Sequence, residues 1–568
     1  MILHCAGIWA AFTSVCEANH WIGGNGLWLD DNRWVYRPEG PDKPPHHPNN
    51  GSPVVDGVPT TYVVLLDTTA TISLGAGVTI SGLTMQRATI NGTGSITVVR
   101  DLSVNPDNNI FKLFNGGRLL GSGTLTLGAQ LPEAYLARTD TSISFPAEPV
   151  TDTVTCNWNI VNRLQPANQG LRLRGEVLGA GTLQNTAGAL MVVEDAQFTY
   201  FNEEGDAEVI YPDVHVYMPV DNRGALEIAV LGHGWFHRTF DHHSGASLKI
   251  KSTGTLQLEK PGLLEGSIEM ASDALLFFDS DGQTGQPDIE LSTPISGGGS
   301  IEVLRRTVDV NVPQSNNARL FLDNSTLNLY EDWHTTGEAA IRSYSSSTPA
   351  VLGGYTQGPT GQLQASTFDI DSTAPGRVEI LASLTTANNP GGQPSYWRGN
   401  GPVWGEGELI IDAQDTLRVS STSSWEPVIF NHGTIHRQAA NNNGQSQFLG
   451  HVHNDNGLVW CERGRMLFDG GYHDETQSVL KAGGTGEIEV TTQEAYSGTV
   501  EAGGDGLIRF SFGRADFLYG SSIKATGTAD VEILSSGDIS GAVTAGGQGV
   551  VHLANGGFTF TQNADIIQ

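Results

Sequence analysis

The chain contains few cysteines and few basic residues, and each shortage excludes a class of protein. Only four cysteines occur in 568 residues, too few for a fold held together by disulfides. Lys and Arg total 30 against 61 Asp and Glu, which gives a formal net charge of −31. A nucleic-acid-binding surface needs clustered basic side chains, so we exclude nucleic acid as a partner. We expect the acidity to serve solubility, with binding of divalent cations as the alternative.

Long apolar runs are also missing. The first 18 residues have an apolar middle and a small residue, Ala18, at a position suited to cleavage, so we expect residues 1–18 to be a signal peptide and the protein to be exported. The alternatives are a misassigned start codon and a first buried strand. No later run is long and apolar enough to span a bilayer. Several motifs of catalysis or nucleotide binding do not occur, among them Gly-x-Ser-x-Gly, His-Glu-x-x-His and a phosphate-binding glycine loop.

Glycine, by contrast, is abundant and follows a pattern. It supplies 71 residues, about one in eight, where about 7% is usual. Ten glycines each precede a short run with hydrophobic residues at its second and fourth positions, or a close variant of that run. They are Gly94, Gly123, Gly181, Gly254, Gly266, Gly299, Gly407, Gly486, Gly506 and Gly549. A single short strand with one apolar face is buried only against copies of itself, so the repetition predicts a stacked β-solenoid.

The spacing of these glycines indicates the size of one coil. Gly486, Gly506, Gly527 and Gly549 are 20, 21 and 22 residues apart. Such a coil holds about three strands of four or five residues, and a mean of about 22 residues predicts on the order of 25 coils. Glycine is expected at coil corners, where the backbone needs φ > 0 or a close approach to the next corner. The variant at Gly181 places Asn185 inward, where an early strand end is favoured over a hydrogen-bonded asparagine ladder.

The N-terminal region has a composition of its own. Residues 19–62 contain Trp21, Trp28 and Trp34 with interspersed glycines, followed by a proline-rich loop, and we expect them to form a cap region. Residues 63–568 are expected to form the solenoid, with loop insertions near 195–245, 305–360 and 386–404. Cys156 and Cys461 would then lie far apart along the stack, so no disulfide is expected between them.

These features resemble a known family. Trp-x-Gly-Gly at Trp21, a second tryptophan at Trp28, Asn-x-Trp at Asn32, a Pro-rich loop and strands ending at Met85 are similar to the N-terminal unit of large secreted bacterial autotransporter-like surface proteins. The Gly-x-Gly and Asn-x-Gly phrases are similar to the repeats of their passenger regions. The resemblance covers most of residues 19–568. It implies a right-handed, single-stranded parallel β-helix that is exported to the cell surface and often adhesive.

Two clusters have the composition of metal sites. Four histidines and an aspartate fall within eleven residues at His233, His237, Asp241, His242 and His243, and imidazole with carboxylate suits zinc or another first-row metal. The alternative is a polar loop or corner. Asp279 and Asp281 precede a glycine, as calcium-binding turns often require. The alternative there is an ordinary Asp-rich turn, so calcium is a possible cofactor and none is required.

Aromatic residues suggest a further site. Tyr396, Trp397 and Trp404 could present ring faces to a sugar, although their spacing also echoes Trp21 to Trp28 and favours a structural role. No catalytic residue can be assigned. We therefore expect an exported, extended structural or adhesive protein that binds a host or neighbouring cell surface, a polysaccharide, or copies of itself. The alternatives are a β-helix polysaccharide lyase or glycoside hydrolase, and a self-assembling extracellular fibre subunit.

Overall fold

The structure of the chain is a computed structural model. It describes residues 15–21, 24–37, 47–50, 54–55, 58–100, 110–137, 152–195, 198–201, 207–279, 289–343, 350–353, 362–373, 376–386, 392–420, 422, 424–439, 444–492, 494–554, 557–561 and 565–567. The chain divides into two compact units, residues 1–277 (unit 1) and 278–568 (unit 2). Within the described residues, no helix has the length and apolarity that crossing a membrane requires.

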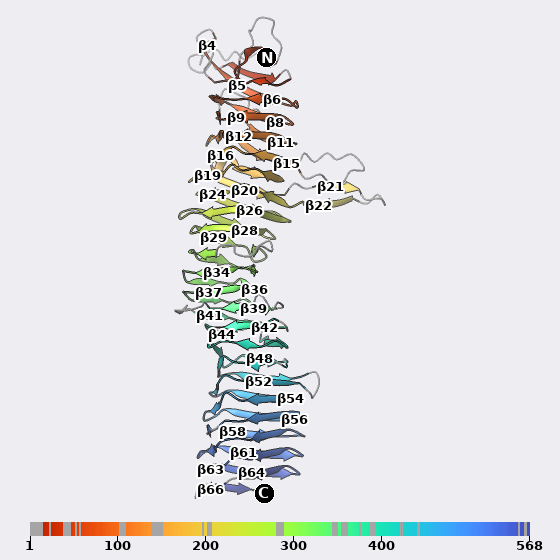
Figure 1. Cartoon of the computed structure of the whole chain (residues 1–568), viewed down its shortest axis with the longest axis vertical. Helices are drawn as coiled ribbons and strands as arrows, with labels where there is room; N and C mark the ends of the chain where they lie inside the picture. Colours follow the sequence, from red (N-terminus) through yellow and green to blue (C-terminus); the bar gives the residue numbers. More distant parts are fainter. Residues whose placement is uncertain are drawn as a thin grey trace, which may run out of the picture. The chain divides into compact units, whose positions relative to one another are not determined.

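Both units are β-solenoids, as the sequence predicted. Strands make up 61% of the structure, and within each unit parallel coils stack on one another (Figure 1). Coil length varies along the chain. Ile96 follows its partner Val78 by 18 residues, whereas Ile160 follows its partner Leu125 by 35. In addition, Gly527 pairs with Gly547 and not with Gly549, so it occupies a different corner of the coil.

Each coil of unit 1 contributes strands to three parallel columns, named faces A, B and C. Face A contains β1 (Val15–Trp21), β5 (Val58–Leu66), β8 (Gly82–Gln86), β11 (Ile110–Phe114), β14 (Glu133–Leu136), β17 (Leu171–Leu173), β20 (Leu190–Glu194), β25 (Ala225–Ala229), β27 (Ser247–Ile250) and β29 (Ser267–Met270). Face B contains β2 (Gly26–Leu27), β6 (Thr71–Ser73), β9 (Thr89–Gly92), β12 (Arg118–Gly121), β15 (Thr153–Cys156), β18 (Glu176–Leu178) and β23 (Val214–Val216). Face C contains β7 (Gly77–Ile80), β10 (Ser95–Val98), β13 (Thr124–Leu127), β16 (Asn159–Asn162), β19 (Leu183–Asn185) and β24 (Val220–Asn222). Two long strands, β26 (His233–His242) and β28 (Thr255–Leu264), run through faces B and C in succession.

Unit 2 has the same three-column plan, with faces D, E and F. Face D contains β33 (Ser300–Leu304), β36 (Arg319–Asp323), β39 (Glu338–Ser343), β42 (Thr367–Ser372), β45 (Ser395–Gly399), β48 (Thr416–Val419), β51 (Thr434–Gln438), β58 (Thr499–Ala502), β61 (Ser522–Gly527), β64 (Ala542–Gly547) and β67 (Asp565–Ile567). Face E contains β31 (Ile289–Leu291), β34 (Thr307–Val310), β37 (Thr326–Leu329), β40 (Ala350–Leu352), β43 (Val378–Ile380), β46 (Val403–Trp404), β49 (Ser424–Trp425), β52 (Gln445–Phe448), β59 (Leu507–Phe510), β62 (Asp530–Ile533) and β65 (Val550–Leu553). Face F contains β35 (Gln314–Asn316), β38 (Trp333–Thr335), β41 (Gln362–Ala365), β44 (Ser383–Thr386), β47 (Glu408–Ile411), β50 (Val428–Asn431), β53 (Val452–Asn454), β55 (Tyr472–Asp474), β57 (Glu494–Tyr496), β60 (Ala515–Phe517), β63 (Gly537–Ile539) and β66 (Phe558–Phe560). The long strands β54 (Leu458–Phe468) and β56 (Val479–Val490) run through faces D and E. Two further strands are β30 (Leu275–Asp279), which spans the boundary, and β32 (Ile295–Gly297).

Alternating hydrophobic residues fill the centre of the coils. In β10 the burial alternates, with Ile96 and Val98 turned inward. Ile96 lies between Val78 of the coil before and Leu125 of the coil after, and these three side chains are buried. Apolar burial contributes about 25 cal/mol for each Å² removed from water, so a core shared from coil to coil stabilises every strand against its two neighbours.

Glycine at the corners is required by close backbone contact. A Cβ atom on Gly181 would lie 2.0 Å from the carbonyl oxygen of Trp158 one coil earlier, and one on Gly94 would lie 2.4 Å from that of Ala76. Backbone atoms at such corners cannot move aside, so no larger side chain fits.

A ladder of asparagines runs through the core of unit 1. Asn162 donates to Asn185 (2.8 Å) and Asn185 donates to Asn222 (2.7 Å). Asn222 then donates to Nδ1 of His242 (2.8 Å), while Nε2 of His242 donates to the carbonyl oxygen of Ser267 (3.1 Å). The favoured interpretation of Asn185, an early strand end, was therefore wrong. Inward polar side chains at one level of successive coils satisfy one another, which is what burial demands of them.

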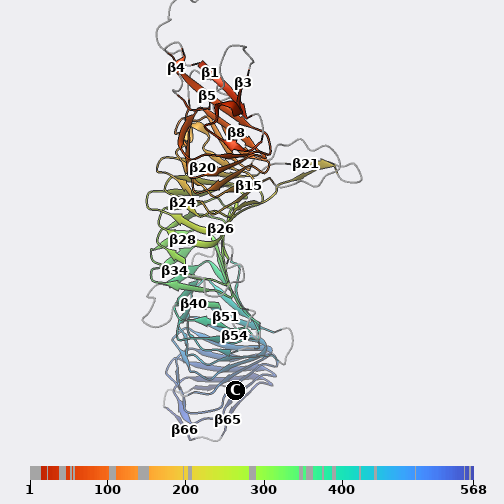
Figure 2. The same ribbon diagram turned by 45° about the horizontal axis from the view of Figure 1, so that its top comes forward.

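The N-terminal region departs from parallel pairing. A short 3₁₀ helix, η1 (Asp31–Arg33), leads into β3 (Trp34–Arg37), which pairs antiparallel with β1; β4 (Val54–Val55) pairs antiparallel with β5 (Figure 2). The ring centroid of Trp34 lies 5.0 Å from that of Trp21 and 4.9 Å from that of Trp28, both in edge-to-face geometry. These three tryptophans are buried and belong to the core at the N-terminal end of the solenoid. Of the expected signal peptide, residues 1–14 lie outside the described residues and residues 15–18 belong to β1.

Where the structure describes them, the segments expected as insertions are mostly coil strands, and residues 196–197, 202–206, 344–349, 354–361 and 387–391 lie outside the described residues. Among the described residues near 195–245, the antiparallel hairpin of β21 (Phe198–Phe201) and β22 (Ala207–Ile210) leaves the stack and projects to the side (Figure 1). The rest of that range forms β23 to β26, because Phe236 and Phe240 turn inward between polar neighbours. The ranges 305–360 and 386–404 likewise contain β34 to β40 and β45 to β46. A second 3₁₀ helix, η3 (Pro166–Asn168), lies before β17, and Cys156 and Cys461 are buried and not disulfide-bonded.

Candidate functional site

The densest group of polar and aromatic rings lies on the outer side of face B. In β26 the inward residues are Gly234 and Phe236, which turns His233, Trp235 and His237 outward. The register pairs Trp235 with His215 of β23, and Tyr217 follows directly after that strand. On the other side, β28 places Glu259 beyond the inward Leu258. We call His215, Tyr217, His233, Trp235, His237 and Glu259 the imidazole–aromatic cluster.

The rings of this cluster stack on one another. Tyr217 and His237 are nearly parallel, with centroids 4.0 Å apart and planes inclined by 6°. Trp235 lies between His215 and His233, with centroid distances of 5.5 Å and 5.8 Å. Each such pair contributes about 0.5–1.5 kcal/mol beyond its buried area, so the rings hold one another in fixed orientations. The cluster is therefore a rigid, partly buried group on the outer side of face B.

A chain of hydrogen bonds crosses the cluster. Nδ1 of His237 lies 2.7 Å from a carboxylate oxygen of Glu259, and Nε2 of His237 lies 3.0 Å from Nδ1 of His215. The side chains of His237 and Glu259 are only 13% and 8% exposed. Burial and the neighbouring His237 lower the pKa of His215, so it is neutral at pH 7. The three groups thus form a carboxylate–imidazole–imidazole chain.

The border of the cluster carries exposed apolar groups. Tyr211, which follows the projecting hairpin, is 37% exposed and Leu231 is 54% exposed. Two carboxylates hold the turn from Leu231 to His233. Asp213 accepts a hydrogen bond from the backbone N–H of His233 (2.8 Å), and Asp195 accepts one from that of Leu231. Burial raises the pKa of Asp195. The rigid cluster therefore lies beside an apolar edge.

The structure separates the five residues expected to bind a metal. His233 and His237 point outward on face B, whereas His242 points into the core as the end of the asparagine ladder. Asp241 accepts from the backbone N–H of Leu263 (3.1 Å), and His243 is 2.9 Å from Asp221. Within the described ranges, no three His, Cys, Asp or Glu side chains are placed to hold a metal ion.

Of the two carboxylates expected in a calcium-binding turn, the structure describes one. Asp279 forms an ion pair with Arg305 at 3.1 Å, and Asp281 lies outside the described residues. A guanidinium group already occupies a carboxylate oxygen that a cation would use.

Tyr396, Trp397 and Trp404 do not form one aromatic platform. Trp397 points inward and is 0% exposed; its ring lies edge-to-face against Trp425 at 5.2 Å. Tyr396 points outward on face D, whereas Trp404 lies on face E and is 39% exposed. Neighbouring residues of a strand point to opposite sides, so Trp397 is core and its neighbour is surface.

Tyr396 and Trp404 each have an arginine partner on the outer surface. The guanidinium group of Arg398 lies 5.1 Å from the ring centroid of Tyr396, and that of Arg377 lies 5.1 Å from that of Trp404. Arg398 also donates from Nε to Asp369 (2.7 Å), a carboxylate that is 2% exposed. On face D, Arg342, Asp369 and Arg398 of three successive coils thus form a row of alternating charges, the charged row, which the sequence did not indicate.

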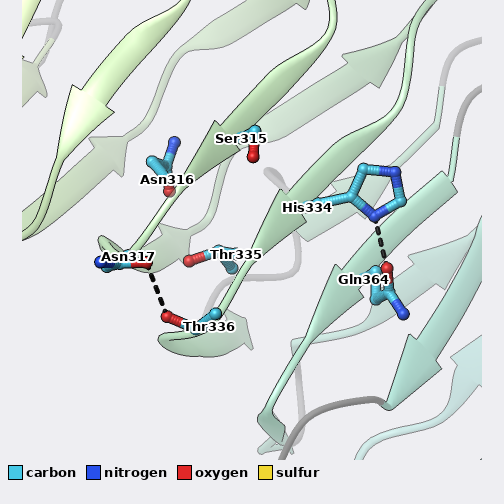
Figure 3. A pocket seen from close by; sticks show the side chains of 7 residues that line it. All are labelled: Ser315, Asn316, Asn317, His334, Thr335, Thr336 and Gln364. Atoms are coloured by element: carbon cyan, nitrogen blue, oxygen red, sulfur yellow. Dashed lines mark hydrogen bonds between the residues drawn. The ribbon is translucent and has the colours of Figure 1, made fainter.

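A small polar pocket of about 210 Å³ opens between β35, β38 and β41 of face F (Figure 3). His334 bonds to Oε1 of Gln364 and Thr336 donates to Asn317 (2.9 Å), as the dashed lines show. The other lining residues are Ser315, Asn316 and Thr335. Thr335 donates to the carbonyl oxygen of Ala318, whereas Nδ2 of Asn316 is buried without a hydrogen-bond partner among the described residues.

Comparison of the chain with protein-family models, with curated proteins and with solved structures gives no match.

Proposed function

We propose that the protein is an exported, extended binding protein that recognises polysaccharide at a cell surface through the outer faces of its coils. The observation that carries this proposal is the imidazole–aromatic cluster, in which Tyr217, Trp235 and His237 stack outside the core. Flat aromatic rings pack against the C–H faces of sugars, while ring nitrogens bond their hydroxyl groups. The exposed Tyr211 and Leu231 would extend this contact.

The charge of the chain narrows the class of polysaccharide. A formal net charge of −31 repels polyanions over the whole surface. The cluster itself contains one carboxylate, Glu259, and no cationic Lys or Arg to offset it. Neutral polysaccharides are therefore the ligands that this surface favours.

The test is a binding assay with neutral and uronic-acid polysaccharides, comparing the wild-type protein with Trp235→Ala. Truncating a stacked tryptophan in a binding surface costs about 2 kcal/mol or more, so affinity for the bound polysaccharide should fall at least about tenfold. Phe512→Ala is the control, because Phe512 is 74% exposed and lies in unit 2. Equal binding by both variants would contradict the proposal.

The charged row on face D favours a second candidate, a glycoside hydrolase or polysaccharide lyase. Burial raises the pKa values of Glu302 and Asp323, while Asp369 accepts from Arg342 (3.3 Å) and Arg398. Neighbouring carboxyl groups in different environments are the starting point of acid–base catalysis on glycosides.

Incubation of the protein with the same polysaccharides, followed by assay for new reducing ends and unsaturated products, tests this candidate. Turnover that Asp369→Asn abolishes and Asp516→Asn preserves would support it, since Asp516 pairs with Arg514 on face F. Polysaccharide that is bound but never cleaved would exclude it.

A further inference from the structure

The asparagine ladder of unit 1 ends in a histidine that is held in one protonation state. His242 is 0% exposed, and its Nε2 lies 3.1 Å from the carbonyl oxygen of Ser267. A carbonyl oxygen only accepts, so Nε2 carries the proton of that bond. Nδ1 lies 2.8 Å from the amide nitrogen of Asn222, which only donates, so Nδ1 is a bare acceptor. The buried imidazole is therefore neutral.

The earlier members of the ladder fix its direction. Asn185 donates from Nδ2 both to Oδ1 of Asn222 (2.7 Å) and to the carbonyl oxygen of Ala225 (2.8 Å). Asn162 likewise donates both to Asn185 and to the carbonyl oxygen of Leu190 (2.8 Å). Turning either amide over would set its oxygen against a carbonyl oxygen, so every donor of the ladder points the same way.

A second proton on His242 has no acceptor in this arrangement. It would lie on Nδ1 and face the N–H of Asn222, and the rest of the ladder opposes the reversal of that amide. The ring also has little room to turn away, because a Cβ atom on Gly266 would lie 2.5 Å from its Nε2. A buried charge without a hydrogen-bond partner is costly, so the surrounding coils should open before they accept it.

The charged side chains near the ring do not offset this cost. Those within two residues of His242 or of its contacts on β24, β28 and β29 turn outward and are exposed or half-buried; they are Asp221, Arg223, Asp241, His243, Glu265 and Glu269. Burial lowers the pKa of His242 below its ordinary 6.5 and the neighbouring His243 adds to this, while the bond to Ser267 acts in the opposite direction.

We propose that His242 is an acid-sensitive joint of unit 1: uptake of a second proton breaks the last bond of the asparagine ladder, and the coils joined by β24, β26 and β29 separate locally. The sign follows from proton counts. Below pH 6.5 the opened chain binds a proton that the folded chain does not, so the free energy of opening falls as pH falls. The inference goes beyond the proposed function, because it holds whatever the outer faces bind.

Hydrogen exchange of the full-length protein, followed by mass spectrometry from pH 7.5 to pH 5, tests the joint. The main variant is His242→Asn, because asparagine offers the ladder an acceptor and donors but takes up no proton. At each pH the exchange of peptides within 214–270 is compared between wild type and variant, so that the intrinsic pH dependence of exchange cancels. We expect a constant ratio above pH 6.5 and a rise of up to about tenfold per pH unit below it, the response to one proton.

His243→Asn is the matched control, because His243 is the next residue but lies 2.9 Å from Asp221 on the outer side. It should keep the acid response of the wild type. His242→Gln replaces His242→Asn if thermal unfolding at pH 7.5 shows that the latter does not fold. The wild type alone gives a further comparison. Below pH 6.5, peptides within 214–270 should gain exchange relative to peptides within 71–98, which contain no histidine and no carboxylate.

Each comparison has a result that overturns the inference. A ratio of wild type to His242→Asn that stays constant down to pH 5 would show that His242 is not the group that responds. Loss of the acid response in His243→Asn would assign the response to the outward histidine instead. Equal changes in the two wild-type segments would show that no local opening occurs. Saccharide binding enters none of these readouts, so a failure of the proposed function is distinguishable from a failure of the joint.

Discussion

At the scale of single residues, the inward polar side chains of the coils have the largest consequences, because each has lost its contact with water. Asp474 is 1% exposed at the end of β55 and accepts from Nδ2 of Asn454 (3.2 Å) and from the backbone N–H of Gly498 (3.1 Å). These bonds favour the charged form, but burial outweighs them and raises the pKa of Asp474 to about 6. Its proton is therefore lost at a higher pH in the folded chain than in the unfolded chain.

The sign of the effect on stability follows from proton counts. Between pH 4 and pH 6 the folded state binds more protons at Asp474 than the unfolded state does, so the free energy of unfolding falls as pH rises. A pKa about 2 units above the ordinary value of 3.8 corresponds to roughly 3 kcal/mol lost by pH 7. Asp474→Asn should remove this part of the pH dependence. Urea unfolding of both proteins from pH 4 to pH 7, followed by hydrogen exchange of the segment 452–498, measures it; parallel pH profiles would contradict the assignment.

The asparagine ladder leads to a second prediction at this scale. Asn185 accepts from Asn162 and donates to Asn222 and to the carbonyl oxygen of Ala225 (2.8 Å). Asn185→Leu would leave buried acceptors without donors, and each such group costs about 1–3 kcal/mol, so we expect roughly 2–4 kcal/mol of destabilisation. Gln184→Ala, on the outward side of the same strand, should change stability by less than about 0.5 kcal/mol. Urea unfolding compares the two, and equal losses would show that the ladder adds nothing.

The residues of the imidazole–aromatic cluster show what sequence alone can identify. His233 and His237 attracted attention because histidines crowd together there, but the partners that give them chemistry, His215 and Glu259, are 22 residues away in either direction. Both separations equal the coil length of about 22 residues expected from the glycine spacing, but because coil lengths vary elsewhere, the sequence did not show that these coils follow it. The asparagine ladder did leave a signal, because β16, β19 and β24 all end in asparagine after an inward hydrophobic residue.

At the scale of elements, corner glycines set how closely successive coils stack. Gly181→Ala places a Cβ atom 2.0 Å from the carbonyl oxygen of Trp158, a backbone atom that cannot turn away. We expect destabilisation of at least about 3 kcal/mol, because relief requires the two coils to separate locally. Gly75→Ala is the matched control, since its Cβ would meet nothing within 4 Å. Thermal unfolding of both variants measures the difference, and an unchanged midpoint for Gly181→Ala would mean that the corner adjusts at little cost.

Strand identity was predictable and strand length was not. The alternating pattern after Gly94 and Gly123 gave β10 and β13, because period-two hydrophobicity with one buried side has few other solutions. The same pattern did not show that β54 and β56 run through two faces without a break. Nor did it show that β3 pairs antiparallel with β1, since side-chain alternation is the same in both kinds of pairing.

At the scale of the whole molecule, stability should be local. In a solenoid each coil touches the coil before and the coil after, so the folding energy is a sum of single-coil terms and nearest-neighbour contacts. The clustering of contacts into two units, residues 1–277 and 278–568, agrees with this arrangement. A defect in one coil should then open its neighbours and leave coils far along the chain unchanged.

Hydrogen exchange measured by mass spectrometry on Gly181→Ala tests this expectation. Peptides within 152–195 and in the adjoining coils should exchange faster than in the wild type, while peptides within 445–492 of unit 2 should keep their rates. Asp474→Asn is the reciprocal case, because it should change exchange around 452–498 and not around Gly181. In the double variant the two changes should add, as they do for sites without shared partners. Acceleration spread evenly over both units by either substitution would mean that the chain unfolds as one cooperative body, and the nearest-neighbour account of its stability would fail.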